Sequence, residues 1–187
     1  VGSEMCIRDR FMGATEVDGH SFKDIGLPEF TVISRKESET GDILYTVEPK
    51  ERIADCPACG GKLHIHKDAK RKVKDLDEFG HRVGIVVKGK SYRCKDCGET
   101  VREEYASICG QMTRRMVESI QRDVFGDMTF TQIARRYNVS VSTVQGLFEE
   151  QGEKLWTAYH FVTPRVLGID EVHLNNAYYG VFVNVDR

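Results

Sequence analysis

Two short cysteine motifs constrain the fold of this chain more than any other feature of its sequence. Segments 56–60 and 94–98 read Cys-Pro-Ala-Cys-Gly and Cys-Lys-Asp-Cys-Gly. A Cys-x-x-Cys turn places two thiolates on one side of a metal, and the following glycine allows the backbone to turn sharply so that its amides point at sulfur. Two such turns complete a tetrahedral shell. We therefore expect a closed, structural zinc site, with the ligands Cys56, Cys59, Cys94 and Cys97.

Other uses of these cysteines fit the sequence less well. Disulfide bonds are rare in cytosolic proteins, and a thioredoxin-like redox site needs only one Cys-x-x-Cys pair. The 34 residues between the two motifs exceed the spacing of compact zinc fingers, so we expect a β-ribbon to fill the interval. His64, His66 and His81 could substitute for a ligand but are interpreted as surface strand residues, and Cys109 as an ordinary residue of a helical region.

The composition describes a soluble, globular chain of 187 residues, of which 40% are hydrophobic and 30% charged. No apolar run approaches the roughly 18 residues that a membrane helix needs, and no secretory signal opens the chain. The expected compartment is the cytoplasm, without membrane attachment.

Residues 1–10 show no hydrophobic period and resemble a translated sequencing-adapter peptide, so they are interpreted as an assembly artefact, together with Cys6.

The net charge of −2 hides a separation of charge along the chain. Residues 11–55 hold ten acidic and five basic side chains, whereas residues 62–93 hold ten Lys or Arg and four Asp or Glu. A basic segment in a near-neutral protein suggests a polyanionic partner on one face. The alternative is a solvated surface that happens to be rich in lysine.

Short strands are predicted in the first half of the chain. Segments 31–33 and 43–47 are rich in β-formers around a turn at 39–42, which predicts an N-terminal β-hairpin segment over residues 11–50. A zinc ribbon is predicted over 51–103, with the strands 73–76, 81–87 and 91–93.

Helices are predicted from residue 104 to residue 160. Apolar residues recur at helical spacing after the cap residue Thr113, and Thr129 with Gln132 forms a capping box. Helices are therefore expected at 113–125, from Thr129, and from Ser140 to about Tyr159.

Segment 129–148 has the pattern of two helices joined by a tight turn. Small Ala134 allows the helices to approach closely, Asn138 tolerates a left-handed backbone, and Ser140 caps the second helix. The apolar residues expected to hold the pair together are Ile133, Val139, Val144, Leu147 and Phe148. We expect a helix-turn-helix, with a plain helical hairpin as the alternative.

In a helix-turn-helix, the start of the second helix enters the major groove of DNA. Gln145 could then read adenine, and Ser142 or Thr143 could bond bases or phosphate. The predicted phosphate contacts are Arg114, Arg115, Arg122, Arg135 and Arg136.

The order of these motifs resembles the ISL-three family of bacterial insertion-sequence transposases over about residues 25–187. The resemblance rests on the two cysteine motifs, the predicted helices and two further stretches, which are Arg71-x-x-x-Asp75-Leu76 and Leu167-Gly168-Ile169-Asp170-Glu171. It implies an α+β, multi-domain chain with a zinc ribbon, a helix-turn-helix domain and, over 161–187, the first β-hairpin of a truncated RNase-H-like domain.

The resemblance also implies a function. In this family the first two domains bind terminal inverted repeats in duplex DNA, and the third cuts and joins DNA with three acidic residues and Mg²⁺ or Mn²⁺. Asp170 stands at the position of the first acid. If strands 166–170 and 179–185 pair, Asp170 lies near Tyr179 and Asp186 is too far away to be the second acid. The chain is therefore expected not to cleave DNA by itself.

The implied partners are duplex DNA and a second copy of the chain, in the bacterial cytoplasm at the nucleoid. A stand-alone transcriptional regulator explains residues 56–148 equally well but leaves the acidic hairpin at 167–186 without a role. An RNA-binding or purely structural zinc ribbon predicts no sequence preference for duplex DNA.

Overall fold

A computed structural model of the chain describes residues 15–18, 25–160 and 164–185. The chain divides into two compact units, residues 1–148 and 149–187. The interpreted adapter peptide 1–10 lies outside the described residues, and so does Asp186. The described chain mixes strands and helices: a β-rich sheet, three helices and a cluster of cysteines.

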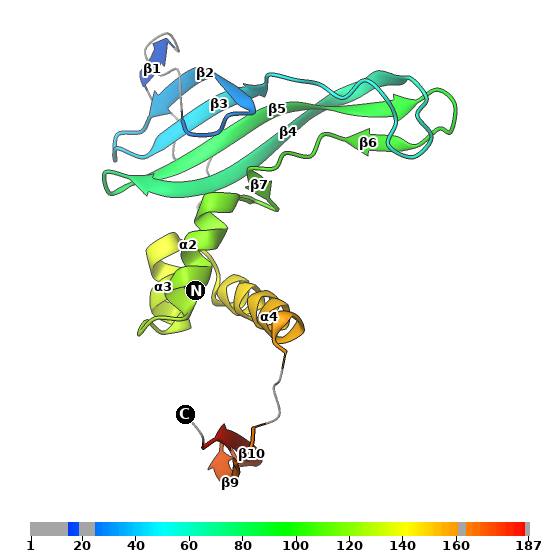
Figure 1. The fold of residues 1–187 in the computed structure, drawn as a ribbon. Helices are drawn as coiled ribbons and strands as arrows, with labels where there is room; N and C mark the ends of the chain where they lie inside the picture. Colours follow the sequence, from blue (N-terminus) through cyan, green and yellow to red (C-terminus); the bar gives the residue numbers. More distant parts are fainter. Residues whose placement is uncertain (1–14, 19–24, 161–163, 186–187) are drawn as a thin grey trace. The chain divides into compact units, whose positions relative to one another are not determined.

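The first unit contains an eight-stranded sheet built around one long antiparallel pair (Figure 1). Its strands are β1 Thr15–Asp18, β2 Phe30–Glu37, β3 Ile43–Pro49, β4 Leu63–Glu78, β5 His81–Cys94, β6 Thr100–Arg102, β7 Ile108–Cys109 and β8 Met112–Thr113. The order across the sheet is β1-β2-β3-β5-β4-β8-β7, and β6 pairs with the far end of β5. Cys109 therefore lies in a strand, and its expected place in a helical region is wrong.

The β4–β5 hairpin is longer than the sequence pattern predicts. Segments 73–76 and 81–87 are indeed strands, but β4 extends back to Leu63 and β5 runs on without a break to Cys94. The two strands meet at Phe79 and Gly80, which both have positive φ, in the two-residue turn that matches the twist of a hairpin. The hairpin thus joins a core region at one end to both cysteine motifs at the other.

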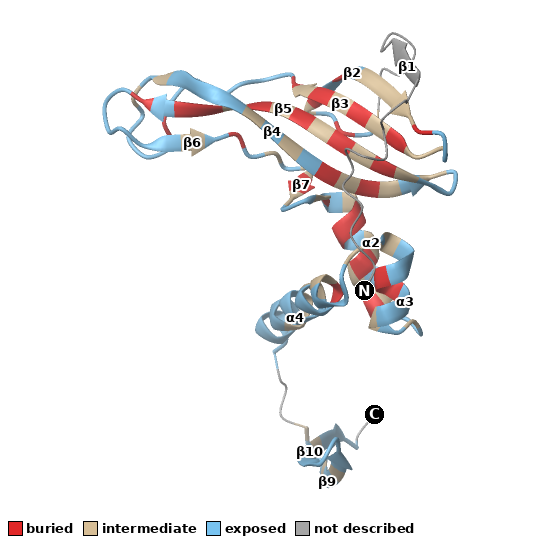
Figure 2. Ribbon diagram, turned by 180° about the vertical axis from the view of Figure 1, so that it is seen from behind, coloured by how far each residue is buried: buried red, intermediate tan, exposed pale blue. Residues whose placement is uncertain are grey.

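The core lies on one face of this sheet. Buried and less buried residues alternate along β3 and β5, as Figure 2 shows, because successive strand residues point to opposite faces. The buried set is Leu27, Phe30, Val32, Ile43, Tyr45, Val47, Val73, Val83, Ile85, Val87 and Ile108. Strand β3 pairs in parallel with β5, with Val47 opposite Val87. The hairpin predicted over 11–50 and the ribbon predicted over 51–103 consequently share one sheet and one core.

Three helices follow the sheet in the described part of the chain. They are α2 Arg114–Val124, α3 Phe130–Tyr137 and α4 Val141–Ala158. The predicted caps are confirmed: Thr113 accepts from the backbone N–H of Met116, and Thr129 forms the capping box with Gln132. A second core joins these helices, made of Met116, Ile120, Val124, Ile133, Ala134 and Val144.

In the second unit, β9 Leu167–Leu174 and β10 Ala177–Asn184 form an antiparallel hairpin. Asn175 and Asn176 have positive φ and make a two-residue turn. The strands are therefore longer than expected, and Asp170 lies opposite Val181, while Tyr179 lies opposite Val172. The expected pairing of Asp170 with Tyr179 is therefore wrong, because the two strands pair in a different register.

No described helix is long and apolar enough to span a membrane.

Candidate metal centre and nucleic-acid interface

The two cysteine motifs form matching turns at one end of the β4–β5 hairpin. In the first, the backbone N–H of Cys56 donates to the carbonyl of Gly61 at 2.8 Å. In the second, the N–H of Cys94 donates to the carbonyl of Glu99 at 2.9 Å. Gly60 and Gly98 have φ of 72° and 75°, a conformation that other residues adopt only with strain. This explains why glycine follows the second cysteine of each motif.

The four sulfur atoms converge as a zinc site requires. All lie within 4.8 Å of one another, and Sγ of Cys56 is 3.7 Å from Sγ of Cys97, while Sγ of Cys59 is 3.5 Å from Sγ of Cys94. Zinc–sulfur bonds of about 2.3 Å in a tetrahedron put the sulfurs about 3.8 Å apart. The donor set and its spacing fit zinc, and the cluster is consistent with a structural zinc ion.

The electrostatics of the cluster also favour a cation. Hydrogen bonds from the backbone N–H groups of Cys97 and Asp96 lower the pKa of Cys94 to about 7. A hydrogen bond from the N–H of Glu99 lowers the pKa of Cys97, but the surrounding sulfurs outweigh it and raise that pKa to about 12. Four thiolates cannot share this space unless a cation compensates their charge, and bound zinc would supply that charge.

The buried carboxylate of Glu103 connects three segments of the chain near the cysteine motifs through hydrogen bonds. Glu103 accepts hydrogen bonds from the hydroxyls of Tyr92 and Tyr105, both at 2.7 Å, and from the backbone N–H of Lys90 at 2.9 Å. Arg52 lies 3.5 Å from the same carboxylate. Although burial would raise the pKa of Glu103, these donors lower it below its ordinary value. Sequence patterns gave no signal for this network.

His64, His66 and His81 are exposed strand residues, as predicted. None belongs to the cysteine cluster, which is the one group of three or more His, Cys, Asp or Glu in the described chain that is close enough to hold a metal. The candidate ligand set is thus the four cysteines.

The turn between α3 and α4 has the expected geometry. Asn138 ends α3 in the left-handed region, with φ 50° and ψ 48°. The N–H of Val139 donates to the carbonyl of Ala134 at 3.0 Å. The hydroxyl of Ser140 then accepts from the N–H of Thr143 at 3.1 Å and caps α4. Ala134 and Val144 are buried between the helices, and Phe148 packs against Phe125 and Phe130.

The predicted base-reading residues lie together in the first turns of α4. Ser142 and Gln145 are exposed. Thr143 is half-buried, and its hydroxyl is 2.7 Å from that of Ser140. The hydroxyl of Ser142 also lies 2.9 Å from that of Ser140. The helix start therefore presents the exposed side chains of Ser142 and Gln145, and the hydroxyls of both Ser142 and Thr143 contact the cap residue.

The predicted phosphate-binding arginines divide into two groups. Arg115 forms a two-point contact with the buried carboxylate of Asp75 and so holds α2 on the sheet. Arg136 lies 3.1 Å from Asp123 and stacks on the Tyr137 ring. Arg136 is nevertheless exposed, as are Arg114, Arg122 and Arg135. The Nε of Arg114 donates to the carbonyl of Ala106.

Contacts between the sheet and the helices were not predicted. Asp75 accepts from the hydroxyl of Thr113 at 2.6 Å as well as from Arg115. Nζ of Lys74 donates to the carbonyl of Asn138 at 2.7 Å, and Arg82 donates to the carbonyl of Arg136 at 2.8 Å. Cations at these carbonyls complement the negative end of α3. Their partners are 38 to 64 residues away in sequence, beyond the reach of local patterns.

Asp170 is exposed on β9, and its carboxylate accepts from the N–H of Glu171 at 2.8 Å. Within the described residues it joins no group of three or more metal-binding side chains. The described residues therefore do not form a two-metal site.

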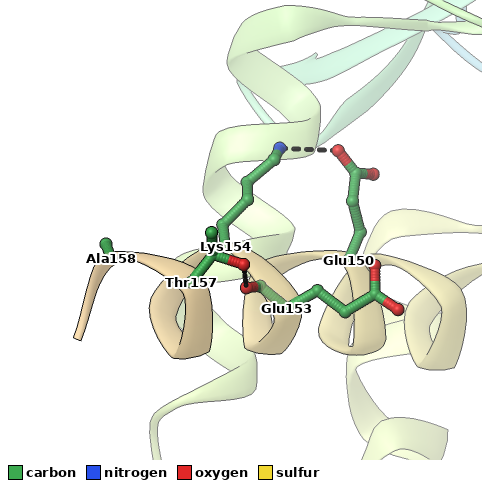
Figure 3. Close-up of a pocket in the computed structure, with 5 residues that line it drawn as sticks. All are labelled: Glu150, Glu153, Lys154, Thr157 and Ala158. Carbon is green, nitrogen blue, oxygen red and sulfur yellow. Dashed lines mark hydrogen bonds and ion pairs between the residues drawn. The ribbon is translucent and has the colours of Figure 1, made fainter. Parts of the chain in front are cut away.

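A shallow depression on α4 offers no alternative site. Its lining residues, Glu150, Glu153, Lys154, Thr157 and Ala158, all come from this one helix (Figure 3). Lys154 pairs with Glu150 at 2.6 Å, and the hydroxyl of Thr157 donates to the carbonyl of Glu153 at 2.8 Å. These groups satisfy each other along the helix and converge on no ligand.

Comparison with known proteins identifies one part of the chain. Residues 54–97 match the family model described as the zinc-finger of transposase IS204/IS1001/IS1096/IS1165. The match contains all four cysteines and the whole of the β4–β5 hairpin. Neither a curated protein nor a solved structure matches the chain. A transposase zinc-ribbon domain in turn suggests DNA binding in a transposase.

Proposed function

We propose that this chain is the DNA-recognition part of a transposase and binds duplex DNA at the terminal inverted repeats of its element. The proposal is carried by the match of residues 54–97 to a transposase zinc-finger model. The four-cysteine cluster in that interval supports it. A zinc site with four cysteine ligands has no open coordination position, so it stabilises the backbone, and DNA must be recognised by other residues.

In this proposal α3 and α4 are a helix-turn-helix, and α4 is the recognition helix. The left-handed Asn138, the buried Ala134 and the cap at Ser140 support it. Ser142 and Gln145 then face base edges in the major groove. Arg114 and Arg135 contact phosphates, whereas Arg115 serves the fold through Asp75.

Asp170 is proposed as the first acid of an RNase-H-like catalytic domain. Its place on the first strand of a β-hairpin supports this role. Cleavage needs further carboxylates to hold the metal pair. Among the described residues Asp170 joins no group of three or more metal-binding side chains. Residues 1–187 are accordingly expected to bind DNA without cutting it, and Mg²⁺-dependent strand cleavage by them would contradict that expectation.

Selection from a randomised duplex library tests the proposal directly. The zinc-loaded chain should enrich one sequence motif, and that motif should occur as inverted copies on both sides of the gene. Gln145→Ala should weaken discrimination by about 1–3 kcal/mol at one base position. Gln151→Ala, six residues further along the same helix, is the matched control and should leave the motif unchanged.

Other outcomes separate the rival functions. Enrichment of a motif that lies only in a promoter would support a transcriptional regulator instead of a transposase. Enrichment of no duplex motif would contradict sequence-specific recognition altogether. Two chains per inverted-repeat pair in native mass spectrometry would agree with a transposase that acts as a dimer.

A further inference from the structure

We infer that the open face of the β4–β5 hairpin is a second DNA-contacting surface, which binds the phosphate backbone of the duplex whose groove receives α4. This surface, the lysine face, consists of Lys70, Lys72 and Lys74 on β4 with Lys88 and Lys90 on β5. The inference rests on the proposed function, since it concerns the same DNA partner.

The strand register places these lysines on one side of the sheet. Lys70 lies directly opposite Lys88, and Lys72 lies opposite Val86. The intervening residues Val73 and Ile85 point to the other face and are only 1% exposed. Alternate positions on a strand are about 7 Å apart, so the lysines of β4 form a regular row of positive charge. A row of this kind matches a linear polyanion.

The arrangement is unfavourable for the isolated protein. Like charges directly opposite each other on paired strands are destabilising, and Lys70 and Lys88 are such a pair. Among residues 25–160, neither they nor Lys72 form an ion pair, whereas Lys90 contacts Asp68. Besides Asp68, the acidic residue Glu48 of the neighbouring strand β3 lies on the same face of the sheet as these lysines. An excess of unpaired ammonium groups on a sheet face indicates an anionic ligand more than a stabilising role.

The lysine face continues to the recognition helix. Lys74, at the end of the row, donates to the carbonyl of Asn138 in the turn that precedes α4. Arg82, across the hairpin, donates to the carbonyl of Arg136 in the last turn of α3. Both contacts lie within the first unit. The row of lysines and the start of α4 are therefore adjacent, so that one duplex can contact both.

The test compares two triple variants of the full, zinc-loaded chain in fluorescence anisotropy with a labelled duplex of arbitrary sequence. Lys70→Gln with Lys72→Gln and Lys88→Gln removes three charges from the lysine face. Lys67→Gln with Lys95→Gln and Lys154→Gln removes three charges elsewhere, including one from the opposite face of β4. The first variant should lower the dependence of log K on log salt by about 0.9 per lysine, or about 2.7. The second should lower it by less than one unit.

Controls separate a loss of DNA contacts from a loss of folding. The zinc content and the urea unfolding of both triple variants should match those of wild type. The single variant Lys88→Gln should be no less stable than wild type but should bind DNA more weakly. The affinity ratio between the selected motif and its scrambled form should be unchanged in the lysine-face variant, because phosphate contacts carry no sequence information. Equal effects of the two triple variants would overturn the inference but leave sequence recognition by α4 standing. Stronger binding of single-stranded RNA than of duplex DNA through this face would also overturn it.

Discussion

Asp75 is the residue on which the connection between sheet and helices depends most. Its carboxylate is buried, accepts from the hydroxyl of Thr113 and forms a two-point contact with Arg115. Thr113 is also the N-cap of α2. One side chain of β4 thus fixes the position at which the helical part of the unit begins.

Replacing Asp75 by Ala should lower the free energy of unfolding by about 3 kcal/mol, because the half-buried guanidinium of Arg115 and the buried hydroxyl of Thr113 lose their acceptor together. Urea denaturation of the zinc-loaded protein measures this loss. Asp77→Ala is the matched control on the same strand. Asp77 forms an exposed pair with Arg82 and should cost less than about 1 kcal/mol. Equal losses for the two variants would contradict the role of Asp75.

Glu103 should make stability depend on pH in the acid range. Burial would raise the pKa of Glu103, but hydrogen bonds from Tyr92, Lys90 and Tyr105 lower it below the ordinary value of 4.5. A lowered folded-state pKa means that the stabilisation is complete above pH 4.5 and is lost as the pH falls through the lowered value. The stability difference between wild type and Glu103→Gln should therefore shrink as the pH falls below 4.5. A difference that is independent of pH would contradict this assignment.

At the residue scale, sequence reasoning succeeded where chemistry is local. The cysteine ligands and the left-handed Asn138 follow from spacing and backbone preference alone. Asp75, Arg82 and Glu103 were missed, because their partners come from distant strands and helices and no short-range pattern marks them.

The turn between α3 and α4 depends on one residue with a left-handed backbone. Asn138 has φ 50°, which glycine adopts freely and alanine only at a cost of about 1 kcal/mol or more. Asn138→Gly should accordingly keep wild-type stability, while Asn138→Ala should lose about 1 kcal/mol, as measured by thermal unfolding. Indistinguishable melting temperatures for the two variants would show that the turn is not held in this conformation.

The zinc ribbon should respond to metal removal locally. The amides of Leu63 and Cys94 lie in the cysteine turns, whereas Val73 and Ile85 belong to the sheet core. Chelation should abolish hydrogen-exchange protection at the first pair and preserve it at the second, since opening follows local contacts. Cys109→Ser, outside the cluster, should leave zinc binding intact. Loss of protection throughout the sheet would contradict this division.

At the element scale, helices were easier to predict than strands. Amphipathic spacing and caps defined α2 and the starts of α3 and α4 almost to the residue. The sequence left open whether the stretch after Leu147 is one helix or two, and the structure has one helix to Ala158. The first half of β4 is exposed on both faces, so it lacks the alternation that marks a strand, and its pairing with β5 holds it extended. The register of β9 with β10 was missed, because a two-residue turn at Asn175 and Asn176 lengthens both strands.

For the whole molecule, the distribution of charge matters more than its sum. A net charge of −2 suggests no polyanionic partner, yet the lysine face and the start of α4 are adjacent in the first unit. The sequence indicated a basic segment but did not show on which face of the sheet its lysine side chains lie. The strand register determines this face, and the register depends on contacts between residues far apart in the chain.

The most direct test of the account is the affinity ratio between the selected duplex and its scrambled form, measured with the zinc-loaded chain and again after chelation. The account predicts one zinc per chain and a ratio of about 10³ or more, with tight binding lost when zinc is removed. A ratio near one with zinc fully bound would contradict sequence-specific DNA recognition, which is its central claim.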